Sequence, residues 1–251
     1  MSLGEHLIEL RKRLFISGFA VLIAAIGGFV VAEFVWDALR VPILAIAEAR
    51  NATINYSTIT SGFDVRIQVA ITIGLVVSSP VWLYQIFAFL VPGLTKKEKR
   101  YTFGFFFSAV PLFLAGCTAG WFVLPNIVRL MASFVPAEDA SFVEAKVYLD
   151  FVLKLVLAVG IAFVLPVFLV LLNFIGVISA AAILKGWRVA ILLIAVFCAI
   201  ATPAADVVSM FLLAIPMVFL YFVAAGIAWL HDRVAARKLQ AFEDELGATS
   251  A

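Results

Sequence analysis

The sequence predicts an all-α integral membrane protein with six transmembrane helices and both termini in the cytoplasm. Of its 251 residues, 65% are apolar and only 14% are charged, whereas soluble domains are about half apolar and about a quarter charged. Six long stretches contain no Asp, Glu, Lys, Arg or His, and basic residues gather on one side of them. Lipid is therefore the solvent for most of the chain, which excludes a cytosolic enzyme, a disulfide scaffold and a disordered tail.

The charge-free stretches place the helices. They cover residues 14–32, 67–95, 101–128, 155–184, 189–205 and 207–230. A helix rises about 1.5 Å per residue, so about 20 residues cross a hydrocarbon core of about 30 Å. We therefore expect one polytopic domain over residues 1–251, with a cytoplasmic tail at 231–251 and spans at about 14–35, 67–92, 103–126, 152–175, 188–203 and 207–229.

The unequal lengths of these stretches predict the shapes of the helices. The second, third and fourth are longer than a bilayer needs, so these helices must tilt, kink or emerge from the lipid. Each contains proline: Pro80 and Pro92, Pro111 and Pro125, and Pro166. The fifth helix is short and ends near Pro203, and Pro216 is expected to break a short sixth helix. Short helices beside long bent ones predict a hollowed shape.

The distribution of Lys and Arg sets the orientation. An even number of spans places both termini on one side, and that side holds 12 of the 18 Lys and Arg: Arg11, Lys12, Arg13, Lys96, Lys97, Lys99, Arg100, Lys185, Arg188, Arg233, Arg237 and Lys238. By the positive-inside rule, this side is cytoplasmic.

The sequence lacks the residue patterns that nucleic-acid binding, enzyme catalysis and metal binding require. The formal net charge of +2 is too balanced to indicate nucleic-acid binding. No HExxH, GxSxG or P-loop is present, and His6 and His231 lie near opposite ends of the chain. We therefore expect no enzyme, cofactor or metal. Cys117 and Cys198 lie in apolar runs and are predicted to be small buried side chains.

Transport of ions or solutes has weak support. Ionisable residues inside spans are expensive and therefore tend to be functional, but the deep interior of these spans contains none. Asp206 stands between the fifth and sixth spans, where capping the sixth helix explains it at least as well as a direct functional role.

Two acidic residues stand among bases on the cytoplasmic side. Leu7, Leu10 and Leu14 share one helical face, which holds Glu9 near the membrane surface. Glu98 lies in the charged segment 96–100. A carboxylate in a structured site accepts two parallel hydrogen bonds from a guanidinium, so two such carboxylates can grip two arginines. The alternative is that Glu9 with Arg13, and Glu98 with its basic neighbours, form ordinary solvated pairs worth less than about 1 kcal/mol.

Four ordered motifs carry a family resemblance. They are HLIELRKRL at 6–14, SSPVWLYQIFAFLVPGLTKKEKR at 78–100, FVLPVFLVLLNFIG at 163–176 and TPAADVVSM at 202–210. Together they resemble TatC, the core receptor subunit of the twin-arginine protein translocase, and the stretch 187–210 looks closest to actinobacterial members. The resemblance covers nearly the whole chain.

The resemblance implies site residues. Glu9 and Glu98 match the glutamates that contact the arginines of the signal peptide, Arg11 belongs to the receptor motif, and Phe89 lines the surface beside the loop site. Three further positions belong to the family's structural motifs: Pro42 in the first external segment, Pro80, and Asp206 after the fifth helix.

The resemblance also implies how the protein works. It implies a cupped, glove-like fold in the plasma membrane of a bacterium, receiving the twin-arginine signal peptides of folded export substrates. A TatB-type single-span subunit docks on the fifth helix, TatA-type subunits are recruited to form the passage, and the receptor complex self-associates. The proton-motive force drives transport, with no nucleotide site on this chain.

Two positions depart from the family pattern. The resemblance implies a buried glutamate in the fourth helix where this chain has Val164, and a lysine where it has Gln68. Asn173 and Gln85 are candidates to compensate for the lost acid. Two alternatives therefore stay open beside a working translocase core: a divergent TatC-like paralogue that binds signals but transports poorly, and a six-helix transporter of small solutes or ions.

Overall fold

A computed structural model describes residues 3–50, 53–90, 96–134, 142–202 and 207–249, without the side chains of some residues near these boundaries. Within these ranges, eight helices and two short strands follow one another: α1 Leu3–Arg50, β1 Thr53–Asn55, α2 Ser61–Val77, α3 Ser79–Leu90, α4 Lys96–Ser133, β2 Phe142–Glu144, α5 Ala145–Phe174, α6 Ala180–Lys185, α7 Trp187–Ala201 and α8 Val207–Thr249. The predicted all-helical architecture is confirmed, apart from a parallel pairing of β1 with β2 that the sequence analysis did not anticipate.

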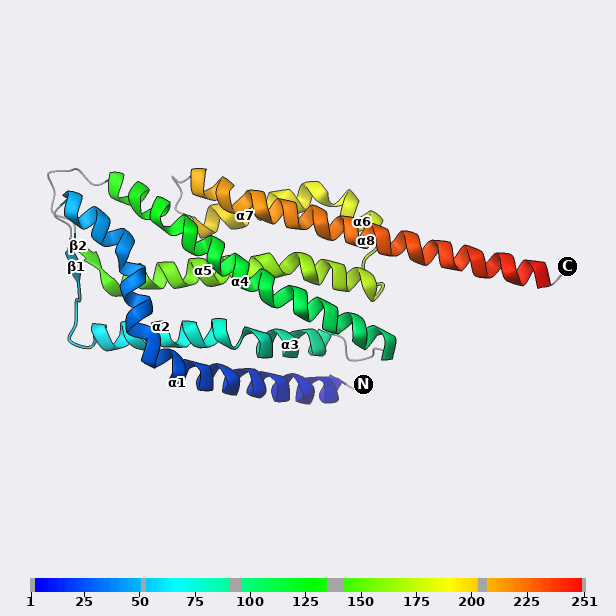
Figure 1. Ribbon diagram of the computed structural model, residues 1–251, viewed down its shortest axis with the longest axis horizontal. Coiled ribbons are helices and arrows are strands. Elements are labelled where there is room, and N and C mark those ends of the chain that lie inside the picture. Colours follow the sequence, from blue (N-terminus) through cyan, green and yellow to red (C-terminus); the bar gives the residue numbers. More distant parts are fainter. Residues whose placement is uncertain (1–2, 51–52, 91–95, 135–141, 203–206, 250–251) are drawn as a thin grey trace.

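The helices form one elongated bundle (Figure 1). The N-terminus, the end of α3 and the turn between α5 and α6 lie at one end of it, and the paired strands lie at the other. Helix α1 changes direction steeply along its length, and the last part of α8 projects beyond the bundle. Elements far apart in sequence therefore meet at the end that carries the N-terminus.

Among the described residues, four helices are long and apolar enough to cross a membrane: α1, α4, α5 and α8. Taken together as one span, α2 and α3 pass the same test, with a bend of 57° between them. The bend falls at Ser78 and Ser79, immediately before Pro80, whose ring removes one backbone N–H donor. The predicted kink of the second helix is confirmed. Helix α7 has 15 residues and is short, as predicted.

The prediction of a short, broken sixth helix is wrong. Helix α8 continues through Pro216 and runs for 43 residues. Prolines also lie inside the continuous helices α4 and α5. In lipid each unpaired backbone group is costly, so a helix that loses one bond to proline still gains by continuing. Helix α1 likewise passes the predicted end at residue 35 and includes Pro42.

Small residues bring neighbouring helices close together. A Cβ atom on Gly74 of α2 would lie 2.8 Å from the backbone N of Ala25 and the backbone O of Val21 in α1. A Cβ atom on Gly116 of α4 would lie 2.8 Å from the Cα of Gly160 in α5. Association inside a membrane depends on van der Waals packing rather than on burial of apolar area, which explains these close approaches.

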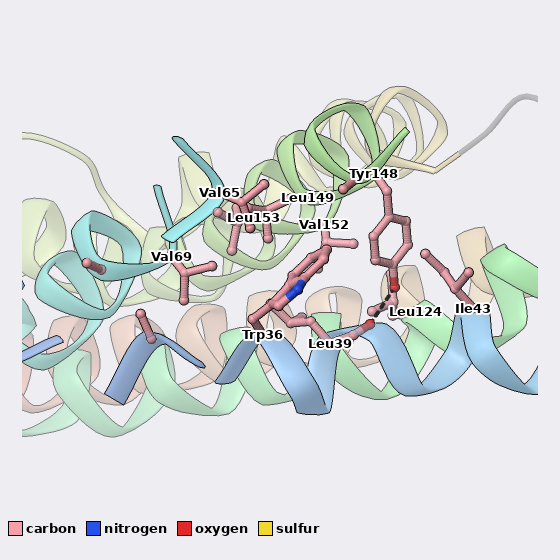
Figure 2. Close-up of a cluster of buried hydrophobic side chains, with 13 residues drawn as sticks. Trp36, Leu39, Ile43, Val65, Val69, Leu124, Tyr148, Leu149, Val152 and Leu153 are labelled. Atoms are coloured by element: carbon pink, nitrogen blue, oxygen red, sulfur yellow. Dashed lines mark hydrogen bonds between the residues drawn. The ribbon is translucent and has the colours of Figure 1, made fainter. Parts of the chain in front are cut away.

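The apolar core nearest the strands joins α1, α2, α4 and α5 (Figure 2). Trp36 of α1 lies against Val152 of α5, and the Tyr148 hydroxyl donates a 2.8 Å hydrogen bond to the backbone O of Leu39. This bond satisfies the polar tip of a buried aromatic side chain. The core fixes α1 against α5, and so it fixes the direction in which the rest of α1 leaves the bundle.

Candidate functional site

Glu9 and Arg13 form an ion pair on consecutive turns of α1. Arg13 donates from both Nε, at 3.1 Å, and Nη2, at 2.6 Å, to the same oxygen of Glu9, Oε1. Both side chains are 22% exposed, so the pair is half-buried rather than freely solvated. The i, i+4 pairing considered in the sequence analysis therefore exists, in a more enclosed form than a surface pair.

Helix α3 holds this pair from the other side. Arg13 also donates from Nη1 to Oε1 of Gln85, 72 residues away, at 3.1 Å. The second oxygen of Glu9, Oε2, is buried and has no hydrogen-bond partner within the described parts of the chain. A cavity of about 430 Å³ opens here and is lined by Glu5, Ile8, Glu9, Lys12, Arg13, Ile16 and Gln85.

An aromatic contact joins the same two helices one turn further on. The ring of His6 in α1 stacks on the ring of Phe89 in α3, with centroids 4.4 Å apart and an interplanar angle of 21°. Phe89 follows Gln85 by four residues, so both lie on the face of α3 that meets α1. Two polar or aromatic contacts thus position the HLIELR segment against the end of α3.

Glu98 lies in the first turn of α4, directly after the segment that follows α3. Its side chain, and the whole of segment 91–95, lie outside what the structure describes. Arg11 is exposed and its guanidinium carbon lies 5.6 Å from the Phe15 ring centroid. Pro42 is half-buried within α1, and Pro80 is exposed near the start of α3. Asp206 lies outside the described residues.

Comparison with known proteins identifies the family. The family model described as "Sec-independent protein translocase protein (TatC)" matches residues 5–216. A Sec-independent protein translocase protein TatC from Xylanimonas cellulosilytica is 43% identical over 95% of this chain and 87% of its own length. A second, from Rothia mucilaginosa, is 40% identical over 95% of this chain and 83% of its own. The chain belongs to the TatC family.

Solved structures agree. One, described as the crystal structure of the twin-arginine translocase receptor TatC, superposes with a TM-score of 0.72 at 33% identity, covering 90% of this chain and 98% of that one. Another, of the receptor in DDM, gives a TM-score of 0.74 at 32% identity. This TatC chain is therefore a subunit of the Sec-independent, twin-arginine protein translocase and not an enzyme. Within the described residues no group of three or more His, Cys, Asp or Glu could hold a metal ion.

Val164 is one of two positions at which this TatC chain departs from the pattern implied by the resemblance. It is 2% exposed and packs in an apolar cluster from α3, α4 and α5: Leu83, Phe87, Ala109, Phe113, Cys117, Val167 and Leu171. Of the two candidates to compensate for the lost acid, Gln85 accepts a hydrogen bond from Arg13 and Asn173 donates one to Asp232. The other departure, Gln68, donates from its side-chain amide to Asp150 of α5, which also pairs with Lys154.

This TatC chain has a second polar cluster, which its sequence did not predict. Asp232 of α8 accepts hydrogen bonds from Nδ2 of Asn173, at 3.0 Å, and from the backbone N–H of Ala180, at 2.7 Å. His231 stacks on Phe174 with ring centroids 3.9 Å apart. These contacts fasten the turn between α5 and α6 to α8. The sequence signal was slight: an acid beside a histidine just after an apolar run.

Proposed function

We propose that this chain is the core receptor of its translocase and recognises twin-arginine signal peptides of folded proteins at the cytoplasmic face. The observation that carries the proposal is the half-buried carboxylate of Glu9, which lines a cavity between α1 and α3. Glu98 follows α3 at the start of α4, so it belongs to the same end of the bundle. Glu9 and Glu98 each receive one arginine of the signal peptide.

The chemistry of this site favours arginine over lysine. A guanidinium is planar, stays charged and presents several donors in a rigid fork, whereas an ammonium is a compact, strongly hydrated charge. Transfer from water into a half-buried site costs the ammonium more. Arg11 and Phe89 border the receptor surface, and the His6–Phe89 stack holds α1 against α3 there.

The proposed topology has six spans. Helix α1, the bent pair α2–α3, α4, α5, α7 and α8 each cross once, which leaves both termini in the cytoplasm of a bacterium and the chain in its plasma membrane. The excess of Lys and Arg at the end of the bundle that holds the N-terminus supports this orientation. Helix α7 is about 22 Å long at about 1.5 Å per residue, so the bilayer thins around it.

The proposed partners are TatB-type and TatA-type single-span subunits, together with further copies of this chain. The proposal that a partner docks on the fifth span, α7, is supported by the apolar surface that this helix exposes. That surface includes Leu192, Leu193, Val196 and Ile200. The bound complex nucleates the passage for the folded substrate, and the proton-motive force drives export.

Export in cells tests this proposal. Cells that lack their own TatC receive the wild-type chain, Glu9→Ala or Glu98→Ala, and export of a folded reporter with a twin-arginine signal is measured. We expect both variants to insert at normal levels and to lose export. Glu243→Ala is the control, because it removes the same charge from an exposed position in the last part of α8. Undiminished export in both site variants would overturn the assignment of the site.

A further inference from the structure

The pairing of Arg13 with Glu9 is unusual in its geometry. An arginine beside a carboxylate commonly spreads two donors over the two oxygens. Here Nε and Nη2 both donate to Oε1, and Oε2 stays buried with no partner among the described residues. The carboxylate is therefore held by one oxygen, and its second oxygen keeps its full capacity to accept.

Arg13 is itself fixed by two helices. Its third contact, from Nη1 to Gln85 of α3 at 3.1 Å, ties the guanidinium to a residue outside its own helix. A cation that displaced Arg13 would have to break three hydrogen bonds in a half-buried site. Oε2 is covered in the free protein, so a donor from the cavity reaches it only after the side chains around it move. Such a donor breaks none of the three bonds, and it pairs an acceptor whose burial without a partner is costly.

We propose that Arg13 is a positioning residue for signal recognition: it anchors Glu9 through Oε1 and so presents Oε2 to the first arginine of the signal peptide. The inference rests on the proposed receptor function and deepens it. Arg13 stays in place when the peptide binds, and Gln85 keeps it there. Recognition at Glu9 then requires the guanidinium of Arg13 as well as that of the first arginine of the signal peptide.

Because charged residues line the cavity, the direction in which peptide affinity changes on removing Arg13 tests the inference. Glu5 and Glu9 are acidic, and Lys12 and Arg13 are basic. If Arg13 only competed with the peptide or repelled it, removing its charge would tighten binding of a cationic peptide. If Arg13 positions Glu9, the same change weakens binding, because the carboxylate loses the contacts that orient it.

The experiment measures the affinity of a twin-arginine peptide and a twin-lysine peptide for the purified full-length chain in nanodiscs. The variants are Arg13→Gln, Arg13→Lys and Gln85→Ala. Lys12→Gln is the matched control, because it removes one positive charge from the same cavity wall and Lys12 makes no described contact with Glu9. Glu9→Ala is included to test the receptor function itself, and the melting temperature of each variant shows that it is folded.

We expect Arg13→Gln to weaken binding of the twin-arginine peptide by about tenfold, the effect of losing roughly one charge-assisted hydrogen bond. Arg13→Lys keeps the charge but loses the fork, so it should also weaken binding and lower the preference for arginine over lysine. Gln85→Ala should change affinity in the same direction by less. Lys12→Gln removes a positive charge from the cavity wall without removing a contact to Glu9, so it should tighten binding slightly, opposite in sign to Arg13→Gln.

Tighter or unchanged binding by Arg13→Gln, with Glu9→Ala still abolishing binding, would overturn the positioning role and leave the receptor function standing. Equal loss in Arg13→Gln and Lys12→Gln would also overturn it, because charge alone would then explain both. Unaltered binding by Glu9→Ala, or no arginine-selective binding by the wild type, would remove the receptor function and this inference with it.

Discussion

Substitution of Gly116 by alanine should separate α4 from α5 and destabilise the bundle. The added Cβ would lie 2.8 Å from the Cα of Gly160, 2.8 Å from the backbone O of Val159 and 2.9 Å from the Cβ of Phe163. Two of these three atoms belong to the backbone of α5, so no side-chain rotation relieves the clash. Ordinary contact begins near 3.4 Å, so the helices must move apart by about 0.6 Å or more.

The expected magnitude follows from two opposing terms. Overpacking a tight interface costs about 1–3 kcal/mol, with backbone clashes at the upper end. Alanine is the better helix former by about 1 kcal/mol, which offsets part of this. The net loss is about 2 kcal/mol, which lowers the melting temperature by about 4–8 °C for a chain of this size.

The assay is thermal unfolding of the purified chain in one detergent, with Gly104→Ala as the matched control. Gly104 lies on the same helix, and no described atom outside its own helix lies within 4 Å of the added Cβ. Gly104→Ala should therefore keep or raise the melting temperature. If the melting temperature of Gly116→Ala equals or exceeds that of Gly104→Ala, then α4 and α5 do not approach each other as described.

Three further perturbations test other parts of the fold. Tyr148→Phe removes the hydrogen bond to the backbone O of Leu39 and should lower stability by about 0.5–1.5 kcal/mol in the same thermal assay; an unchanged melting temperature would mean that the bond contributes nothing. Asp232→Ala removes two acceptors from the turn before α6, so backbone amides of Ala180–Lys185 should exchange hydrogen faster, while those of α5 keep their protection. Val164→Glu places a carboxyl in an apolar cluster and should make the free energy of membrane insertion less favourable by about 2.5–3.5 kcal/mol. It should also alter transport and leave peptide affinity unchanged. A loss of affinity without a change in transport would contradict the separation of these two roles.

Local composition was sufficient to predict the class and most of the helices. The charge-free stretches locate α1, α2–α3, α4, α5, α7 and α8, because a helix in lipid needs only a sufficiently long apolar run. The kink before Pro80 was also predictable, since it depends on one local backbone donor. Proline alone did not predict breaks correctly, because Pro216 lies inside a continuous α8 whose surroundings decide the outcome.

Contacts between distant segments could not be predicted in the same way. The hydrogen bond from Arg13 to Gln85 spans 72 residues, and the bonds of Asp232 to Asn173 and Ala180 span 59 and 52. These pairs depend on how α1, α3, α5 and α8 pack, which no local pattern encodes. The sequence identified Glu9 as an acid near the membrane surface, but only the packing reveals that one of its oxygens is held while the other has no partner among the residues that the structure describes.

A double-mutant cycle between receptor and peptide tests the central claim most directly. Affinities are measured for peptides carrying Arg-Arg, Lys-Arg, Arg-Lys and Lys-Lys against the wild type, Glu9→Gln and Glu98→Gln. Groups in direct contact show coupling of about 0.5–3 kcal/mol, whereas independent ones add. Two arginines gripped by two carboxylates predict that each glutamate variant becomes insensitive to lysine at one peptide position and stays sensitive at the other. Additive effects at both positions, or equal binding of all four peptides by the wild type, would contradict the claim that Glu9 and Glu98 receive the signal arginines.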